Sequence, residues 1–418
     1  MGILRKLGQI FSASAKEMPP SRGPEPAAKP EPVLVEGKTD LAAVVKGNGA
    51  FALDLYSRLS SCSGNLFFSP FSISTALAMA YGGAQGATAE EIAAALRFPF
   101  GQNRLHPAFA DLLKQARGRS RGIELSLANG LWAQHGYEFR ESFIDLVKSH
   151  YGADLRELDF STAAAEACRI INEWVEKQTH GKIRHLIEPS ALGPLTRLVL
   201  ANAIYFKGDW ASPFEKDQTE DAPFTVTPNQ KVTVPMMHQL ADYSYLETDS
   251  FQALGLAYEG WDLAMVVFLP RKVEGLPELE KSLTPEKLRT WLAGLRPRVV
   301  NAYFPRFRAT STFMLNEVLA EMGMRLAFHL SGADFSGMSG SEHLFLSLIL
   351  HKAYVDVDEK GTEAAAVTVQ GVVTGARWGW HQIERIPVFR ADHPFLFLIK
   401  DDRSGSILFL GRVTNPKE

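Results

Sequence analysis

The sequence predicts an α+β fold, in which helices and strands occupy different parts of the chain. Two observations lead to this prediction. Apolar residues recur with helical spacing in the first third of the 418 residues. The rest of the chain contains short β-branched and aromatic runs bounded by Gly, Pro and Asp. Because the two kinds of segment do not alternate, a doubly wound parallel sheet is disfavoured.

Helices are predicted over "LAAVVKGNGAFALDLYSRLSS", over "FSISTALAMAYGG" and over "TAEEIAAAL", which opens with a Thr88-x-x-Glu91 capping box. A further helix from Ala165 places Ile170, Trp174 and Val175 on one side and stops near Gly181. Strands are predicted over "TRLVLANAIYF", "LAMVVFLP", "VVNAYFPRF", "LILHKAYVDVD", "PFLFLIK" and "SILFLGRV".

The chain divides into a tail and one large domain. Residues 18–35 carry six prolines and few side chains that could pack, which is typical of a solvated linker. From about Asp40 the composition is globular and contains no second linker. We therefore predict a disordered tail over 1–38, rich in Pro, Ala and Glu, and a single domain over 39–418.

Composition and motifs exclude several functions. The net charge of −3 argues against a nucleic-acid partner. The sequence contains no run of 18 apolar residues, so no transmembrane segment is predicted. No metal-binding or cofactor motif and no catalytic site can be assembled. The sequence "GMSGS" at 337–341 lacks the final glycine of a nucleophile elbow. Cys62 and Cys168 are isolated, and we predict buried or half-buried thiols.

A basic cluster follows an amphipathic stretch and comprises Lys114, Arg117, Arg119 and Arg121. Four cations in eight residues would suit a sulfated polysaccharide or a phosphate. The alternative is a solvated helix end, where cations oppose the negative pole of the helix dipole. His351 closes an apolar run, which predicts a hydrogen-bonded histidine in the core.

The segment "DEKGTEAAAVTVQ", Asp358–Gln370, is unusually small-sided. In an extended strand, one face carries Thr362, Ala364, Ala366, Thr368 and Gln370, and the other carries Gly361, Glu363, Ala365, Val367 and Val369. The first face lacks bulk, so the strand could enter between crowded elements. Such a segment suits a loop in one state and a strand in another, although a permanently flexible loop is the alternative.

These residues resemble the hinge of the reactive-centre loop of the serpins, a superfamily of serine protease inhibitors. Further matching motifs occur in the family's order over most of the globular part. They are "NLFFSPFSISTALAMAYGGAQGATAEEI", "INEWVEKQTHGKIRHLI", "LVLANAIYFKGDW", "VPMMHQ", "ADFSGMSG", "LHKAYVDVDEKGTEAA" and "HPFLFLI…ILFLGRVTNP".

The resemblance implies a fold of about nine helices and three β-sheets, with an exposed reactive-centre loop at about 359–385. A target serine protease cleaves the loop and is trapped as an acyl-enzyme when the loop inserts into the central sheet. The protein is then an inhibitor and not an enzyme. The implied hinge comprises Glu359, Lys360, Gly361, Thr362, Glu363, Ala364, Ala365 and Ala366.

The resemblance also assigns roles around the sheet. Ser69, Ser72, Asn202 and His351 match the shutter, the polar cluster where the central sheet parts. Trp210 matches the aromatic residue of the breach, where insertion begins.

The family's spacing from Glu359 places the reactive bond at Gly375–Ala376, which suits subtilisin-like or elastase-like proteases. The segment up to Pro394 is several residues longer than in most serpins. Arg377, for a trypsin-like enzyme, and Trp378, for a chymotrypsin-like enzyme, are therefore alternatives. Trp378 and Trp380 could instead act as exposed anchors for a partner.

Two further questions stay open at the level of sequence. A non-inhibitory serpin, acting as a carrier or chaperone, is the main rival function. Bulky, charged or proline residues at the hinge would favour it, and this hinge lacks them at its inward positions. We expect a monomer. No signal peptide is visible, which suggests the cytoplasm, whereas most relatives implied by the resemblance act outside cells.

Overall fold

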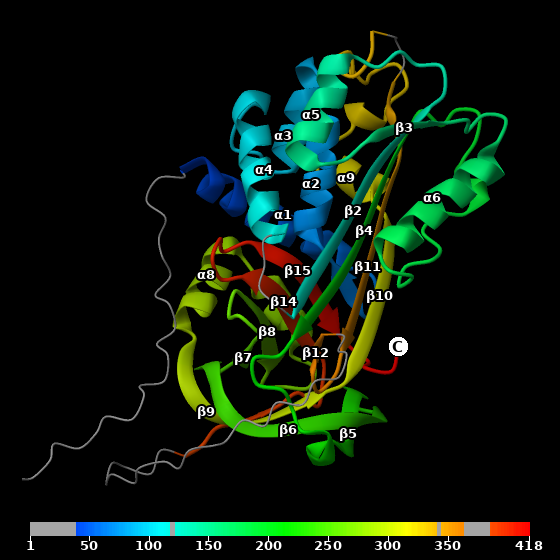
Figure 1. Cartoon of the computed structure of the whole chain (residues 1–418). Coiled ribbons are helices and arrows are strands. Elements are labelled where there is room, and N and C mark those ends of the chain that lie inside the picture. Colours follow the sequence, from blue (N-terminus) through cyan, green and yellow to red (C-terminus); the bar gives the residue numbers. More distant parts are fainter. Residues whose placement is uncertain (1–38, 118–121, 341–343, 363–384) are drawn as a thin grey trace, which may run out of the picture. The chain divides into compact units, whose positions relative to one another are not determined.

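The computed structural model describes residues 39–117, 122–340, 344–362 and 385–418 (Figure 1). The helices of these residues are α1 (Thr39–Leu59), α2 (Pro70–Tyr81), α3 (Gly86–Ala95), α4 (Gln102–Arg117), α5 (Glu141–Tyr151), α6 (Ala164–Gln178), α7 (Leu276–Ser282), α8 (Pro285–Gly294) and α9 (Asn316–Glu321). Short 3-10 helices lie at Pro189–Ala191, Lys216–Gln218 and Leu326–Phe328. Among the described helices, none is long and apolar enough to cross a membrane.

The strands form two hydrogen-bonded sheets. The nine-stranded sheet contains β1 (Leu66–Phe68), β5 (Glu220–Thr227), β6 (Gln230–Glu247), β7 (Phe251–Ala257), β8 (Leu263–Pro270), β9 (Arg296–Pro305), β13 (Val388–Arg390), β14 (Phe395–Asp401) and β15 (Ile407–Val413). The six-stranded sheet contains β2 (Ile123–Gln134), β3 (Leu155–Leu158), β4 (Leu198–Asp209), β10 (Phe307–Met314), β11 (Leu346–Val357) and β12 (Gly361–Thr362).

The α+β class agrees with the sequence prediction, and the three sheets implied by the resemblance are joined into two. The 18-residue strand β6 is the reason. Its first part pairs with β5, its last part pairs with β7, and β9 runs beside it from Met236 to Tyr245. One long strand therefore makes two sheets continuous within the described residues.

Helix α2 lies at the centre of the fold, and all of its residues are buried. It begins because Ser69 caps it: the Ser69 hydroxyl accepts a hydrogen bond from the Ser72 amide at 3.0 Å, and Pro70 stands at the first helical position. The helix is buried all round because it packs between the two sheets and the other N-terminal helices.

The capping box predicted at Thr88 is wrong. Helix α3 begins at Gly86, and Thr88 lies inside its first turn. The Thr88 hydroxyl instead accepts a hydrogen bond from the Asp334 amide at 2.9 Å, while Glu91 accepts from the amides of Arg325 and Leu326 at 2.7 Å each. Tertiary partners from 234 or more residues away thus take both side chains that a local cap would use.

Helix α6 ends as predicted, but its buried face is displaced by one residue. Its buried residues are Ala167, Cys168, Ile171 and Val175, whereas Ile170 and Trp174 are half-buried. Gly181 has φ +76° and its amide donates to the Glu176 carbonyl at 2.8 Å, which closes the helix end. Cys168 is buried as expected, whereas Cys62 is exposed because it follows the end of α1 in a turn.

The six-stranded sheet has two distinct faces. We call the face covered by α6 the α6 face; it carries Val199, Ala201 and Ala203 of β4 together with the buried residues of α6. We call the opposite face the core face; it carries Leu200, Ile204 and Phe206 of β4 and packs against α2. Figure 1 shows α6 and the bundle around α2 on the two sides of this sheet.

Candidate functional site

Strands β4 and β11 form the centre of the six-stranded sheet and run parallel to each other. They pair from Leu198 with Leu346 to Tyr205 with Tyr354. Beyond that point they separate, and the two-residue strand β12 lies between them. Thr362 pairs with Gly208 of β4 and with Val357 of β11, antiparallel to both strands. The sheet is thus closed along most of its length and holds the start of a new strand at one end.

Glycine is required at position 361 by the close approach of two backbones. A Cβ atom there would lie 2.0 Å from the Gly208 oxygen and 2.7 Å from the Asp209 Cα. The next side chain, Thr362, is 0% exposed and its hydroxyl lies 2.7 Å from the Tyr258 hydroxyl. Thr362 therefore points to the core face, because Tyr258 packs edge-on against Phe206.

The turn before β12 is fixed by Asp358. Its carboxylate accepts hydrogen bonds from the amides of Lys360 at 2.9 Å and Gly361 at 3.3 Å. Its own amide donates to the Gly361 carbonyl at 2.9 Å. This arrangement is a tight, self-bonded turn, so β12 leaves the end of β11 in a defined direction.

Glu359 anchors the outside of this turn. Its carboxylate is 1% exposed and accepts hydrogen bonds from Arg306 Nε at 2.7 Å and from the Thr219 hydroxyl at 2.6 Å. Burial alone would raise the pKa of Glu359, but the hydrogen bonds from Arg306 and Thr219 outweigh it and hold the pKa below its ordinary value. The Glu359 carbonyl also accepts from the Phe214 amide at 2.8 Å.

Trp210 lies beside the turn and contacts it twice. Its indole Nε1 donates to the Asp358 carbonyl at 3.0 Å, and its backbone amide donates to the Lys360 carbonyl at 2.7 Å. The ring stacks on Tyr258 at 4.6 Å between centroids. Trp210, Tyr258 and Thr362 therefore form one buried contact at the entrance between β4 and β11.

A polar cluster crosses the same sheet deeper in the molecule. Asn129 of β2, Asn202 of β4 and His351 of β11 lie directly opposite one another in register. The Asn202 amide nitrogen donates to the Ser72 hydroxyl at 2.5 Å and also contacts Asn129. The four residues matched to the shutter thus lie together, and the structure adds Asn129 to them.

His351 is the most constrained member of this cluster. It is 0% exposed, and its Nε2 accepts a hydrogen bond from the Ser69 amide at 3.1 Å. The other ring nitrogen, Nδ1, must therefore carry the proton that it donates to Asn202 Oδ1. Burial lowers the pKa of His351 to about 3, so the ring is neutral at physiological pH.

The cover over the α6 face is held by specific bonds. The Asn172 side-chain oxygen accepts from the amides of Leu186 at 2.8 Å and Ile187 at 3.1 Å, and its nitrogen donates to the Ile187 carbonyl at 2.8 Å. Lys352 of β11 donates to the His185 carbonyl at 2.6 Å. Helix α6 and the segment after it are thereby fastened over β4 and β11.

Several residues predicted for the site lie outside the described part of the chain. They are Glu363, Ala364, Ala365, Ala366, Gly375, Ala376, Arg377 and Trp378, together with Arg119 and Arg121 of the basic cluster. Lys114 is exposed on α4, and the backbone of Arg117 ends that helix. Ser339 of "GMSGS" is buried and donates to the Glu138 carbonyl at 2.7 Å, as a structural residue does.

Four partners at the site were missed by the sequence reasoning: Asn129, Thr219, Tyr258 and Arg306. Each lies between 53 and 140 residues from the residue that it contacts, so no local pattern reveals it. The available signal for Asn129 was an amide inside the apolar run "LANGLWA" of β2. A half-buried amide in such a run needs hydrogen-bond partners across the sheet.

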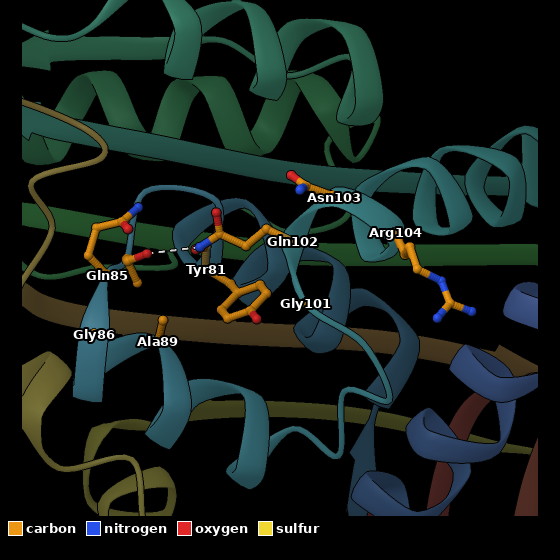
Figure 2. A pocket seen from close by; sticks show the side chains of 9 residues that line it. Tyr81, Gln85, Gly86, Ala89, Gly101, Gln102, Asn103 and Arg104 are labelled. Carbon is orange, nitrogen blue, oxygen red and sulfur yellow. Dashed lines mark hydrogen bonds between the residues drawn. The ribbon is translucent and has the colours of Figure 1, made fainter.

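A separate hollow of about 370 Å³ lies among α2, α3 and α4 (Figure 2). The Gln102 amide spans part of it and donates to the carbonyls of Tyr81 at 2.7 Å and Ala84 at 2.8 Å. Arg104 is paired with Asp40 at 2.5 Å. The polar groups named here already have partners, and the hollow shares no lining residue with the hinge. Within the described ranges, no group of three or more His, Cys, Asp or Glu side chains is placed to hold a metal ion.

The fold and this site define an α+β protein whose six-stranded sheet holds a two-residue strand, β12, at one end between two parallel strands. Comparison with known families agrees with that class: residues 46–416 match the family described as "Serpin (serine protease inhibitor)". The chain therefore belongs to the serpin family, a family of protease inhibitors rather than enzymes.

Relatives and solved structures cover most of the chain. It is 42% identical to an uncharacterized serpin-like protein of Thermococcus kodakarensis, over 92% of this chain and 88% of that one. It is 41% identical to human leukocyte elastase inhibitor, over 88% of this chain and 98% of the relative. The crystal structure of human thyroxine-binding globulin with thyroxine superposes with a TM-score of 0.81 at 33% identity, over 91% of this chain and 100% of that chain.

Proposed function

We propose that this serpin is a suicide inhibitor of serine proteases. The segment that follows Thr362 is the loop that a protease attacks. The protease cleaves a bond in this loop and forms an acyl-enzyme. The cleaved loop then extends β12 between β4 and β11 and carries the protease with it before the ester is hydrolysed. The observation that supports this most strongly is the position of β12, which already occupies the entrance between the two parallel strands.

The register of β12 specifies what insertion would bring together. Continuing the pairs Thr362–Gly208 and Thr362–Val357 by six residues places Thr368 opposite both Asn202 and His351. Counted from Thr362 in the same register, the tenth residue is Val372, which would lie opposite Leu198, the first residue of β4. The loop therefore has the length to fill the whole gap if the two strands part.

The side chains of that extension suit the two faces of the sheet. Ala364, Ala366 and Thr368 share the direction of Thr362 and would face the core face, where space is limited by packing. Ala365, Val367 and Val369 would face α6, and Glu363 would lie beside Lys207. Gln370 is the one large polar side chain directed to the core face, so it would need a hydrogen-bond partner there.

We place the reactive bond at Gly375–Ala376, with Arg377 and Trp378 as alternatives. The seventeen residues from Glu359 to Gly375 would extend to roughly 55 Å at about 3.3 Å per residue, about the size of a domain. The similarity to leukocyte elastase inhibitor supports an elastase-like target, and the small residues before Gly375 also suit a subtilisin-like one. In this proposal residues 39–418 act as a monomeric inhibitory domain after a tail over 1–38.

The experiment is incubation with an elastase, a subtilisin and a trypsin, followed by denaturing electrophoresis. We expect a covalent complex that survives SDS with at least one protease, and mass spectrometry of the released fragment identifies the cleaved bond. Cleavage by all three enzymes without any complex would contradict inhibition. That result would favour a carrier role, since thyroxine-binding globulin, which binds thyroxine, has the same fold.

A further inference from the structure

One face of the nine-stranded sheet exposes an unusual number of apolar side chains. Nine large apolar residues of the described chain are strongly exposed, and four of them lie together here: Leu240 at 53%, Val299 at 42%, Ile386 at 48% and Val388 at 49%. Their neighbours on the other side of the same strands, such as Val300, Ala302 and Phe389, are fully buried. We call the exposed side the β6–β9–β13 face.

The register explains why these side chains meet. Leu240 of β6 and Val388 of β13 both pair with Asn301 of β9, so the three form one row. Asp242 pairs with Val299 in the next row. Residues opposite one another in register point to the same side of a sheet, so the apolar side chains form one patch, in which Asn301 lies between Leu240 and Val388 and Asp242 lies beside Val299.

One edge of the patch is rigid and polar. His238, Tyr303 and Arg390 form the row beside Leu240: the His238 ring stacks on Tyr303 at 4.4 Å, and the Arg390 guanidinium lies 4.3 Å from the Tyr303 centroid. His238 Nε2 also lies 2.6 Å from Asn301 Oδ1. These side chains are held by one another, so little conformational entropy is lost when a partner covers them.

The position of the face identifies its partner. The chain that carries the candidate reactive bonds enters the face directly through Arg385 and Ile386, and the Pro387 carbonyl accepts from the Asn301 amide at 3.0 Å. Strand β6 is also linked to the segment that contacts the hinge turn, because Gln239 donates to the Pro213 carbonyl at 2.7 Å and the Phe214 amide donates to the Glu359 carbonyl at 2.8 Å. A protease bound to the loop would therefore lie next to this face.

The size of the patch favours that partner over a second copy of this chain. The patch comprises four exposed apolar side chains and one adjoining polar row. A stable interface uses about 20–30 residues on each partner. The patch is thus too small to hold two copies together by itself, but it suits a secondary contact that supplements the loop.

We propose that the β6–β9–β13 face docks the target protease beside its active-site cleft, on an apolar protease surface. The inference rests on the proposed inhibitory function and concerns the encounter before cleavage. It makes Leu240 and Val388 determinants of which protease is inhibited quickly.

The test compares Leu240→Ser combined with Val388→Thr with a matched control, Leu195→Ser. Leu195 is also an exposed leucine, at 68%, and lies before β4 rather than on this face. With a protease that forms the covalent complex, we expect the double variant to lower the association rate constant about tenfold. The stoichiometry of inhibition should stay unchanged, and the control should match the wild type. Binding to the same protease with its catalytic serine replaced by alanine should weaken by a similar factor.

The outcomes separate the two proposals. If the wild type forms no covalent complex with any protease, the inhibitory function fails, and the docking proposal fails with it. If the wild type inhibits but the double variant associates as fast as Leu195→Ser, only the docking proposal is overturned. Sedimentation of the free proteins provides a further check. A dimer that becomes monomeric in the double variant, with unchanged association, would identify the face as a self-contact and would likewise overturn docking.

Discussion

At the scale of single residues, the proposed insertion of the loop would start from Thr362. Its side chain is 0% exposed and contacts the Tyr258 hydroxyl at 2.7 Å. A guanidinium would not fit into this space, and its charge would be buried without solvation. We predict that Thr362→Arg converts the inhibitor into a substrate, with many molecules cleaved for each protease trapped. Titration of protease activity measures this ratio. Thr362→Ser, which keeps the hydroxyl, should behave as the wild type, and an unchanged ratio in Thr362→Arg would contradict the assigned insertion face.

Thr368 gives a second prediction, drawn from the register. Once inserted, its hydroxyl would lie between Asn202 and His351, whose direct hydrogen bond the new strand would interrupt. Thr368→Val should therefore destabilise the cleaved chain by about 1–3 kcal/mol while leaving the uncleaved chain unchanged. Thermal unfolding of both forms measures the effect. Thr368→Ser should restore the lost stability; equal behaviour of Val and Ser would count against this register.

His351 makes the stability of the uncleaved chain depend on pH. The buried ring stays neutral, because burial lowers its pKa to about 3 from an ordinary value of 6.5. Below pH 6.5 the imidazole of His351 binds a proton in the unfolded chain but not in the folded chain. The free energy of unfolding therefore decreases as the pH is lowered from 6.5 to about 3. The loss from this group approaches about 1.4 kcal/mol per pH unit. Denaturant unfolding should show a shallower pH dependence in His351→Gln than in the wild type; parallel curves would contradict the assignment.

At the scale of elements, α6 is the structure that the proposed strand insertion would have to displace. It covers β4 and β11 on the α6 face, and Asn172 fastens the following segment through the amides of Leu186 and Ile187. Asn172→Ala should weaken this cover locally by about 1–3 kcal/mol. Hydrogen exchange at 183–187 should become faster, and the covalent complex should form no more slowly than in the wild type. Asn172→Asp keeps the accepting oxygen, so its hydrogen exchange rates should lie between those of the wild type and those of Asn172→Ala.

Elements that depend on local sequence patterns could be predicted from the sequence, whereas contacts between residues far apart in the chain could not. The strands β8, β11, β14 and β15 follow from short β-branched and aromatic runs bounded by Gly, Pro and Asp, and the α+β class follows from their arrangement. The capping box at Thr88 failed because Asp334, from far along the chain, takes its hydroxyl. In the same way, Tyr258 and Arg306 complete the hinge from 104 and 53 residues away. Alternation along the chain indicates which way Thr362 points but not what it contacts.

At the scale of the whole molecule, the sheet is closed where the loop would enter. Nearly all of the parallel pairing between β4 and β11 would have to be broken, and a central antiparallel strand would replace it. Ten inserted residues would form about ten additional ladder hydrogen bonds, each contributing about 1 kcal/mol. The uncleaved chain is therefore expected to be less stable than its cleaved form, and this difference would drive protease trapping.

The most direct test of this account is the thermal unfolding midpoint of the chain before and after cleavage in the loop by a trace of subtilisin. Insertion between β4 and β11 predicts a rise of roughly 20 °C or more, from about 10 kcal/mol of added stability. Thr362→Arg, cleaved in the same way, should show a much smaller rise. A cleaved wild-type chain that unfolds at the same temperature as the intact chain, or below it, would contradict insertion and with it the proposed mechanism of inhibition.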